Sequence, residues 1–423
     1  MVTEAERKIL KSRKMTKDFI DKQPIYYDEG KKWWSWSKGK KQWLMIDETE
    51  LFIQFDKIFP QKGHVSLDPR IKSILKNSLK RFARINKPKE MKKTFVQFKD
   101  TILDLETMDE FEATPKYFTT NPIPWKLGND DKTPVMDKIF KEWVGEENVK
   151  VLYQIIAYCI LPDYPLNRIF CLRGEGSNGK SKFLDLLTKF VGNNNVVTTE
   201  LDTLLSSRFE QVKLFKKLAC VMGEINKKNI TQTSVLKRLS GGDLVRFELK
   251  FKNPFDGYNY AKIIISTNKL PRTEDPSRGF YRRWLMVDFL NEFPETKDIL
   301  EDIPEKEYYA LTRKSINVLK ELLKKREFDR EGTIEERKKK YEEASNPFGI
   351  FLDRYCKFNK DYYVPFKEFF ERFEKYLKDN GRGSITSKSL GTILSDEGYK
   401  TENKYDPETQ KNRNVIWGLK LKE

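Results

Sequence analysis

Hydrophobic and polar positions in the first third of the chain predict a mixture of helices and strands. A charged stretch over residues 1–25 is typical of a helix that ends near Pro24. Two apolar runs, 33–36 and 43–46, flank a Lys-Gly-Lys turn and predict a β-hairpin. Apolar residues then recur at helical spacing from 71 to 83. We therefore expect an N-terminal lead-in domain over residues 1–135, built from a hairpin and helices.

Four tryptophans gather in this predicted hairpin. They are Trp33, Trp34, Trp36 and Trp43. Their spacing fits a small core, and we favour that interpretation. The alternative is that their rings stack on nucleic-acid bases.

From residue 166 to residue 290, short apolar runs alternate with helical segments. This alternation predicts an α/β layer fold, in which helices flank a parallel sheet. An apolar helix over 149–161 precedes it, so we place a central domain at residues 136–295. Residues 296–345 are helical and highly charged, and we interpret them as a helical connector.

A break at Asn346-Pro347 begins a C-terminal domain over residues 346–423. Helical patterns over 366–377 and 387–394 and an apolar strand over 415–421 fit a winged helix. The second helix of such a domain could enter a DNA groove, or the domain could instead serve as a protein contact or a lid.

Composition narrows the classes of protein that fit this pattern. The chain has 423 residues, of which 38% are hydrophobic and 13% aromatic, so a mostly disordered chain is excluded. No apolar run reaches the roughly 18 residues of a membrane span, and the first residues carry no apolar signal-peptide core. We expect a soluble cytoplasmic protein with no membrane partner.

Charge and the scarcity of histidine and cysteine narrow the chemistry further. Lys and Arg number 81 and Asp and Glu 64, which leaves a formal charge of +17. This surplus suggests a polyanionic partner, although Lys/Glu-rich surfaces also accompany thermostability. His64 is the only histidine, and the four cysteines form no Cys-x-x-Cys pair. A Cys/His zinc site, protease chemistry and histidine-dependent nicking of DNA are therefore disfavoured.

The strongest motif is a phosphate-binding loop of the form G-x-x-x-x-G-K-[ST]. It consists of Gly174, Glu175, Gly176, Ser177, Asn178, Gly179, Lys180 and Ser181. A buried-type strand precedes it and a helix follows, as the chemistry requires, because backbone N–H groups and a helix N-terminus attract phosphate. We expect Lys180 to reach the β- and γ-phosphates and the Ser181 hydroxyl to ligate Mg²⁺.

Two later apolar runs end on polar residues that would complete such a site. The run 218–223 is followed by Glu224, which we expect to polarise the attacking water, to help hold Mg²⁺, or both. Gly223 stands where many NTPases carry a second acid. The run 261–267 is followed by Asn268, whose neutral amide can orient the water and sense the γ-phosphate.

Cationic residues follow each of these features. Arg282 and Arg283 come soon after the asparagine, and a guanidinium offered across a subunit boundary would neutralise charge on a transferring phosphoryl group. Residues 245–255 alternate and turn at a Lys/Asn/Pro tip, which predicts a β-hairpin that carries Lys250 and Lys252. Such a hairpin could grip a single strand through its phosphates, or could be a merely solvated turn.

Taken together, these residues resemble the superfamily 3 helicases, and more closely the helicase half of phage, plasmid and poxvirus primase-helicases. The resemblance rests on residues 174–181, Glu224, the Lys237…Gly241-Gly242-Asp243 segment, Ser266-Thr267-Asn268 and Arg282-Arg283. It covers most of residues 30–423 and is most specific between 170 and 290. The Lys-rich composition further suggests the helicase half of a primase-polymerase from a deep-sea-vent phage.

The resemblance implies a homohexameric AAA+-type ring that hydrolyses ATP at its subunit interfaces, in an infected or plasmid-bearing cell. It assigns ATP and Mg²⁺ to the loop at 174–181, with Ser181 and Glu224 at the metal. Glu224 takes the Walker B role, and Asn268 takes the sensor role.

The resemblance also implies an arginine finger and a DNA contact. Arg283, or in second place Arg282, would reach the neighbouring subunit's nucleotide. Lys250 and Lys252 would contact single-stranded or forked DNA in the central channel. The primase or polymerase half of the family would lie in the same longer polypeptide or in a separate protein.

Two rival functions stay open at this point. A motor that remodels or loads proteins on DNA without unwinding would keep the nucleotide site but would not need Lys250 and Lys252. A scaffold that binds ATP only to assemble is suggested by the missing second acid at Gly223.

Overall fold

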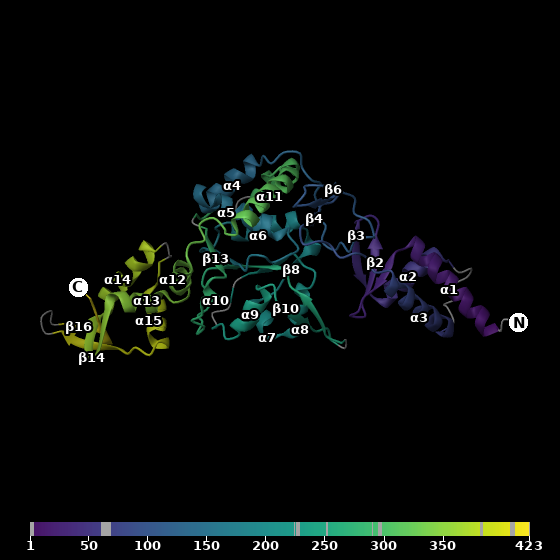
Figure 1. Cartoon of the computed structure of the whole chain (residues 1–423). Coiled ribbons are helices and arrows are strands. Elements are labelled where there is room, and N and C mark those ends of the chain that lie inside the picture. Colours follow the sequence, from purple (N-terminus) through teal and green to yellow (C-terminus); the bar gives the residue numbers. More distant parts are fainter. Residues whose placement is uncertain are drawn as a thin grey trace.

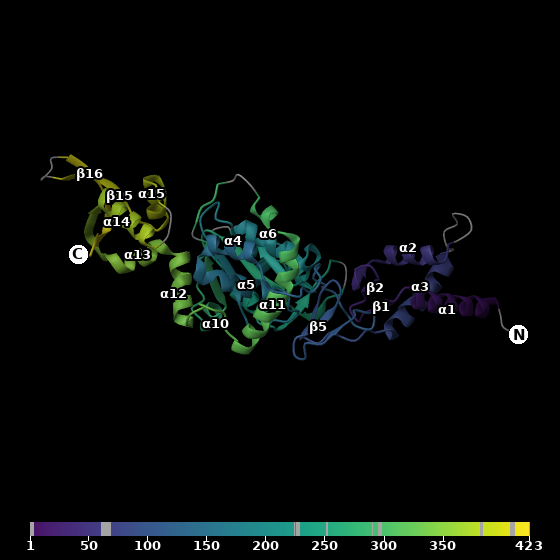
Figure 2. The same cartoon turned by 90° about the horizontal axis from the view of Figure 1, so that it is seen from above.

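A computed structural model of the chain describes residues 4–60, 69–223, 225, 229–250, 253–289, 291–294, 298–380, 384–406 and 411–422. Three parts follow one another in a row, and both views show the same order (Figure 1, Figure 2). An N-terminal module lies at one end, a central α/β core in the middle and a C-terminal module at the other end. No described helix is long and apolar enough to cross a bilayer.

The central core is built on a five-stranded parallel sheet with the order β13-β7-β12-β9-β8. These strands are β7 (Ile169–Arg173), β8 (Val196–Thr198), β9 (Ala219–Met222), β12 (Lys262–Thr267) and β13 (Trp284–Asp288). Strands β7, β9 and β12 each contain an uninterrupted apolar run because both faces of the sheet are covered. The order confirms the predicted α/β class and places β12 directly between β7 and β9.

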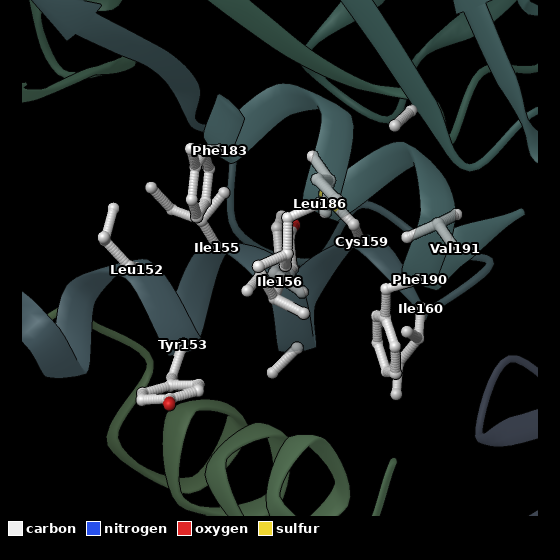
Figure 3. Close-up of a cluster of buried hydrophobic side chains, with 14 of the residues drawn as sticks. Leu152, Tyr153, Ile155, Ile156, Cys159, Ile160, Phe183, Leu186, Phe190 and Val191 are labelled. Carbon is white, nitrogen blue, oxygen red and sulfur yellow. The ribbon is translucent and has the colours of Figure 1, made fainter. Parts of the chain in front are cut away.

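Helices cover both faces of this sheet, and alternate side chains of the strands enter a separate core on each face. One face packs against α4 (Pro134–Val144), α5 (Val149–Cys159), α6 (Lys180–Val191) and α11 (Glu305–Lys325). Figure 3 shows part of the core on this face, with Ile156 of α5 and Leu186 of α6 among its buried side chains. The other face packs against α7 (Leu201–Ser206), α9 (Thr233–Leu239), α10 (Arg278–Tyr281) and α12 (Ile334–Ser345).

The segment 296–345, predicted as a connector, is part of the central core. Leu311, Ile316 and Leu319 of α11 are fully buried in the same core as α5. Tyr341 of α12 is fully buried beside Trp284, and its hydroxyl donates to the Pro271 carbonyl at 2.9 Å. The expected connector is therefore corrected, because an apolar stripe under the charged surface docks both helices onto the sheet.

The N-terminal module combines a helical layer with two small sheets. It contains α1 (Glu4–Lys22), β1 (Ile25–Tyr27), β2 (Trp33–Ser37), β3 (Gln42–Ile46), α2 (Glu48–Ile58), α3 (Pro69–Ile85), β4 (Phe95–Gln97), β5 (Ile102–Asp104) and β6 (Glu110–Phe111). The predicted hairpin is β2–β3, and its four tryptophans are each at most 5% exposed. Their role in a core is confirmed, which leaves none of them as a surface for base stacking. His64 lies outside the described residues.

The C-terminal module has its own core and the element order of a winged helix. It contains α13 (Pro347–Tyr355), β14 (Cys356–Pro365), α14 (Phe366–Asp379), α15 (Ser387–Asp396), β15 (Thr401–Asp406) and β16 (Lys411–Leu421). Its three antiparallel strands have the order β14-β16-β15. Asn346 caps α13 by accepting a bond from the Gly349 N–H at 3.0 Å, and Pro347 fills the first helical position.

The remaining elements lie within the central part of the chain. They are α8 (Arg208–Gln211), the antiparallel hairpin β10 (Leu244–Phe247) and β11 (Phe255–Tyr258), and 3₁₀ turns at Glu146–Asn148, Asn193–Asn195, Val212–Leu214 and Ile299–Asp302. The β10–β11 hairpin extends away from the five-stranded sheet (Figure 1), where the alternating pattern predicted a hairpin.

Candidate functional site

The phosphate-binding loop joins the end of β7 to the start of α6, as predicted. Gly179 has φ +89°, and an added Cβ there would overlap the indole nitrogen of Trp143. A Cβ on Gly174 would lie 2.7 Å from the Phe289 carbonyl oxygen. Both glycines are therefore required by conformation or by close backbone approach, which is what a loop wrapped tightly around a phosphate needs.

Lys180 is held inside the loop. Its ammonium donates to the carbonyls of Gly174 at 2.7 Å and Glu175 at 2.6 Å and to the Asn178 side-chain oxygen at 2.8 Å. Only 8% of the residue is exposed. Ser181, the next residue of α6, is exposed. The loop thus presents a cation, a hydroxyl and the N-terminus of a 12-residue helix at one place.

A cavity of about 570 Å³ opens beside this loop. Its lining comprises Trp143, residues 176–182, Leu184, Gly223, Ser266, Asn268, Phe293, Pro294, Ile299 and Asp302. Gly223 and Asn268 reach it because β12 lies between β7 and β9, so the carboxyl ends of three parallel strands meet at one edge. Glu224 lies outside the described residues, and Gly223, which precedes it, borders the cavity.

A segment after β13, not anticipated from the sequence, forms the far wall of this cavity. The Phe293 N–H donates to the Ser177 carbonyl at 2.8 Å. Lys182 of α6 makes an ion pair with Asp298 at 3.2 Å. These contacts fix the segment against the loop. An aromatic side chain at this wall, Phe293, is the kind of group that packs against a planar base.

The residues of this cavity fit a nucleoside triphosphate with Mg²⁺. Backbone N–H groups, Lys180 and the α6 N-terminus suit phosphate oxygens, and the Ser181 hydroxyl suits a hard cation. Asn268 is exposed and offers a neutral amide to the same space. Among the described residues, no group of three or more His, Cys, Asp or Glu side chains could hold a metal by itself.

The two candidate arginines lie at the opposite edge of the sheet from the loop. They precede β13, whose first residue pairs with Ile169, whereas the loop follows Arg173 at the other end of β7. Arg283 is 7% exposed, and its guanidinium donates to the Ser240 hydroxyl at 3.1 Å and to the carbonyls of Gly279 and Lys237. Burial lowers the pKa of Arg283.

Arg282 has the opposite surroundings, because its side chain is exposed. Neither arginine can serve the cavity of its own chain, since the length of the sheet separates them. The first choice of Arg283 as the residue that reaches another subunit is therefore corrected: its guanidinium is occupied inside the core, and Arg282 presents its charge to solvent.

The β10–β11 hairpin carries Lys250 at its end, and Lys252 lies outside the described residues. Lys250 is exposed, and its ammonium lies 5.9 Å from the ring centroid of Phe209. Phe209, on α8, is 47% exposed. No pattern in the sequence singles out Phe209, because its exposure depends on the packing of a four-residue helix. The structure thus places a large exposed ring beside the hairpin lysine.

The hairpin contacts the N-terminal module near its turn, at Phe255, which pairs with Phe247 in the last strand pair before the turn. The ammonium of Lys32, at the start of β2, lies 2.9 Å from the ring centroid of Phe255 in β11 and 4.2 Å from that of Phe215. Lys32 is 5% exposed, so this contact is buried. The hairpin is therefore attached directly to the module that precedes the core.

Comparisons with known proteins find relatives of low sequence identity. Residues 172–283 match a family model described as a family of unknown function, DUF5906. A protein of Acanthamoeba polyphaga mimivirus named "Putative helicase L207/L206" is 24% identical over 233 residues, which is 51% of this chain. The match spans only 24% of that relative's length.

A solved structure of the NrS-1 C terminal region shares the fold. One apo structure, covering residues 305-718 of that protein, matches with a TM-score of 0.50 and 13% identity, over 96% of this chain and 99% of the other. A second, the A form, gives a TM-score of 0.48 at the same identity. The first match shows a common architecture across nearly the whole chain.

Proposed function

We propose that this chain is an ATP-dependent DNA helicase motor that moves along a single strand. The observation that carries the proposal is the cavity at which the phosphate-binding loop, the end of β9 and the end of β12 meet. The mimivirus relative bears a helicase name, and the match to it supports the same function here.

In the proposed hydrolysis, each of the predicted site residues has one task. The loop and Lys180 bind the β- and γ-phosphates, and Mg²⁺ held with Ser181 would neutralise charge on the same phosphates. Glu224 takes a proton from water, whose oxygen attacks the γ-phosphorus while the bond to the β-phosphate oxygen breaks and ADP leaves. Asn268 orients that water through its amide.

A second copy of the chain is needed to complete the site. The developing negative charge on the γ-phosphoryl group calls for a cation, and Arg282 cannot reach the cavity of its own chain. We place Arg282 as the finger that a neighbouring subunit supplies, which requires a ring or another repeating assembly. A homohexamer is the assembly that the family resemblance favours.

The β10–β11 hairpin is the proposed contact with DNA. Lys250 supplies a phosphate contact, and Phe209 beside it supplies a ring on which a base can stack. Because β10 follows α9 and β11 leads directly into β12, the hairpin is continuous with the strand that ends at Asn268. Changes at the γ-phosphate therefore have a short covalent route to the DNA contact.

The decisive experiment measures ATP hydrolysis with and without single-stranded DNA. Wild type is compared with Lys250→Ala/Lys252→Ala and with a control variant, Lys324→Ala/Lys339→Ala, which removes two exposed lysines of α11 and α12. We expect DNA to stimulate hydrolysis in wild type and control but not in the hairpin variant. Hydrolysis that is indifferent to DNA in all three proteins would refute a translocating motor.

Unwinding is tested separately on a forked duplex with a fluorophore and quencher at its end. Strand separation should require ATP and should be lost in Glu224→Gln. DNA-stimulated hydrolysis without strand separation would favour a remodelling or loading motor instead. Absence of any ATP turnover, with ATP binding intact, would favour an assembly scaffold.

A further inference from the structure

A second cavity, of about 760 Å³, lies between the N-terminal module and the C-terminal end of α6. We call it the Trp125 cavity. It is lined by Gly39, Lys40, Gln42, Lys99, residues 122–125, Asp185, Thr188, Lys189 and residues 192–195. It shares no lining residue with the nucleotide cavity, which borders the opposite end of α6. The function proposed above gives it no role.

The indole of Trp125 is held rigidly at this cavity. Its ring stacks on Tyr308 with centroids 4.6 Å apart and planes 14° apart, and Tyr309 meets it edge-on at 5.7 Å. Its indole N–H donates to the Lys189 carbonyl at 3.3 Å. A half-buried aromatic ring that is fixed in position and borders a cavity is a ready platform for another flat ring.

The end of α6 does not make this cavity negative. A helix C-terminus normally exposes unpaired carbonyls, which repel anions. Here the Thr188 carbonyl accepts from the Gly192 N–H at 2.8 Å, and the Val191 carbonyl accepts from the Asn195 side chain at 2.8 Å. Trp125 satisfies the Lys189 carbonyl. Three carbonyls of the last turn are therefore already bonded.

The charged side chains at the cavity are mostly cationic. Lys40, Lys99 and Lys189 are exposed, and Asp185 is the one acid among the lining residues. Within the described part of the chain, none of these three lysines makes an ion pair, and the Lys189 ammonium lies over the Tyr308 ring at 4.5 Å. The three lysines come from a hairpin turn, a loop and a helix, so their charges are spread along the lining of the cavity and do not form a single anion site.

We infer that the Trp125 cavity binds a nucleotide unit of single-stranded DNA, with the base against Trp125 and neighbouring phosphates at Lys40 and Lys99. The inference deepens the proposed function and rests on it. A chain segment fits better than a free nucleotide, because the lysines lie on separate elements and no glycine-rich loop gathers N–H groups for one phosphate group. The cavity would be a second strand contact besides the hairpin.

The test uses a fluorescent thymidine oligonucleotide and the full chain, with binding followed by anisotropy at several salt concentrations. Trp125→Leu should weaken binding about 10-fold or more with little change in salt dependence, because stacking is lost and charge is kept. Lys40→Ala/Lys99→Ala should lower the slope of log K against log salt by about 1.4, which corresponds to two phosphate contacts. The control variant Lys324→Ala/Lys339→Ala should bind like wild type.

A second readout locates the contact without a disabling substitution. An oligonucleotide with 5-iodouracil is cross-linked by light to wild type, and the modified peptide is identified by mass spectrometry. A cross-link at Trp125 is expected. Trp125→Phe keeps an aromatic ring and serves as a control for a folding defect. It should bind the oligonucleotide better than Trp125→Leu does, and the circular dichroism spectra of both variants should match that of wild type.

The outcomes separate this inference from the proposed function. Wild type that binds the oligonucleotide, with the lysine pair and Trp125 variants indistinguishable from it and cross-links elsewhere, overturns the inference alone. Wild type that fails to bind single strands at all overturns both. Displacement of the oligonucleotide from Trp125 by free nucleotide at equal affinity would assign the cavity to nucleotides and overturn the strand contact.

Discussion

Lys262 offers a quantitative test of the packing in the central sheet. It is the first residue of β12, it is fully buried, and its ammonium donates to the Leu161 carbonyl. The rings of Tyr158 and Tyr164 lie 4.9 Å and 5.9 Å from that ammonium. Burial lowers the pKa of Lys262 from 10.5 to about 7, and the nearby Asp163 carboxylate opposes this shift only in part.

The sign of the resulting pH dependence follows from proton counting. Between pH 10.5 and about pH 7 the unfolded chain holds a proton on this lysine that the folded chain has lost. The contribution of Lys262 to the free energy of unfolding is therefore greatest above pH 10.5 and decreases as the pH falls towards 7. Below pH 7 the lysine is protonated in both the folded and the unfolded chain, so its contribution no longer changes with pH. Between pH 9 and pH 7 the loss amounts to about 2 kcal/mol.

The perturbation is Lys262→Met, which keeps the volume and removes the titration. Urea unfolding of both proteins is followed by tryptophan fluorescence at pH 7, 8 and 9, and the difference in unfolding free energy is taken at each pH. Cysteine and tyrosine titrations cancel in that difference. We expect the variant to gain about 2 kcal/mol relative to wild type on going from pH 9 to pH 7. If the difference in unfolding free energy does not change with pH, the pKa of Lys262 is not lowered in the folded chain. Lys324→Met, at an exposed position, is the control.

Further predictions concern the nucleotide and DNA contacts. Gly179→Ala should abolish binding of a fluorescent ATP analogue and destabilise the core by roughly 2–4 kcal/mol, because its φ of +89° and the indole of Trp143 leave no room for a Cβ. Arg282→Ala should lower ATP hydrolysis by about 10³-fold with ATP affinity kept, and normal turnover would remove it as the finger. Arg283→Ala should instead lower the unfolding free energy by roughly 2–4 kcal/mol in denaturation, since the buried Ser240 hydroxyl and two partly buried carbonyls lose their donor. Phe209→Ala should reduce DNA stimulation of hydrolysis while DNA-free turnover persists, and equal stimulation would exclude base stacking there.

Local patterns were sufficient for the elements that carry their own signal. Continuous apolar strands, the glycines at 174 and 179 and the alternation of β10 and β11 each predict their structure from neighbouring residues. The tryptophans of β2 and β3 were also predicted as core, because large apolar residues closely spaced on both sides of a turn motif favour burial, although Trp33 enters a different cluster from the other three. The parallel sheet follows from strands that alternate with helices.

Features that depend on packing between distant segments could not be predicted in this way. Arg282 and Arg283 are adjacent and chemically identical, and only the carbonyls of Gly279 and Lys237 decide which one is buried. Because many residues of α11 are charged, its sequence does not reveal the row of apolar residues through which it packs on α5. The Trp125 cavity is lined by segments that are up to about 150 residues apart in the sequence, so no local pattern predicts it.

The contact of Lys32 with Phe255 and Phe215 has a thermodynamic consequence for the proposed DNA contact. Each desolvated cation–π contact contributes about 1–2 kcal/mol. The free energy with which the N-terminal module docks therefore depends on the position of β11. A strand of DNA that shifts Phe255 must change how tightly the module docks. By reciprocity, the docked module must change the affinity of the hairpin for DNA by the same factor. If the hairpin binds DNA as proposed, the lead-in module is an effector of that contact, although it lies outside the central α/β core.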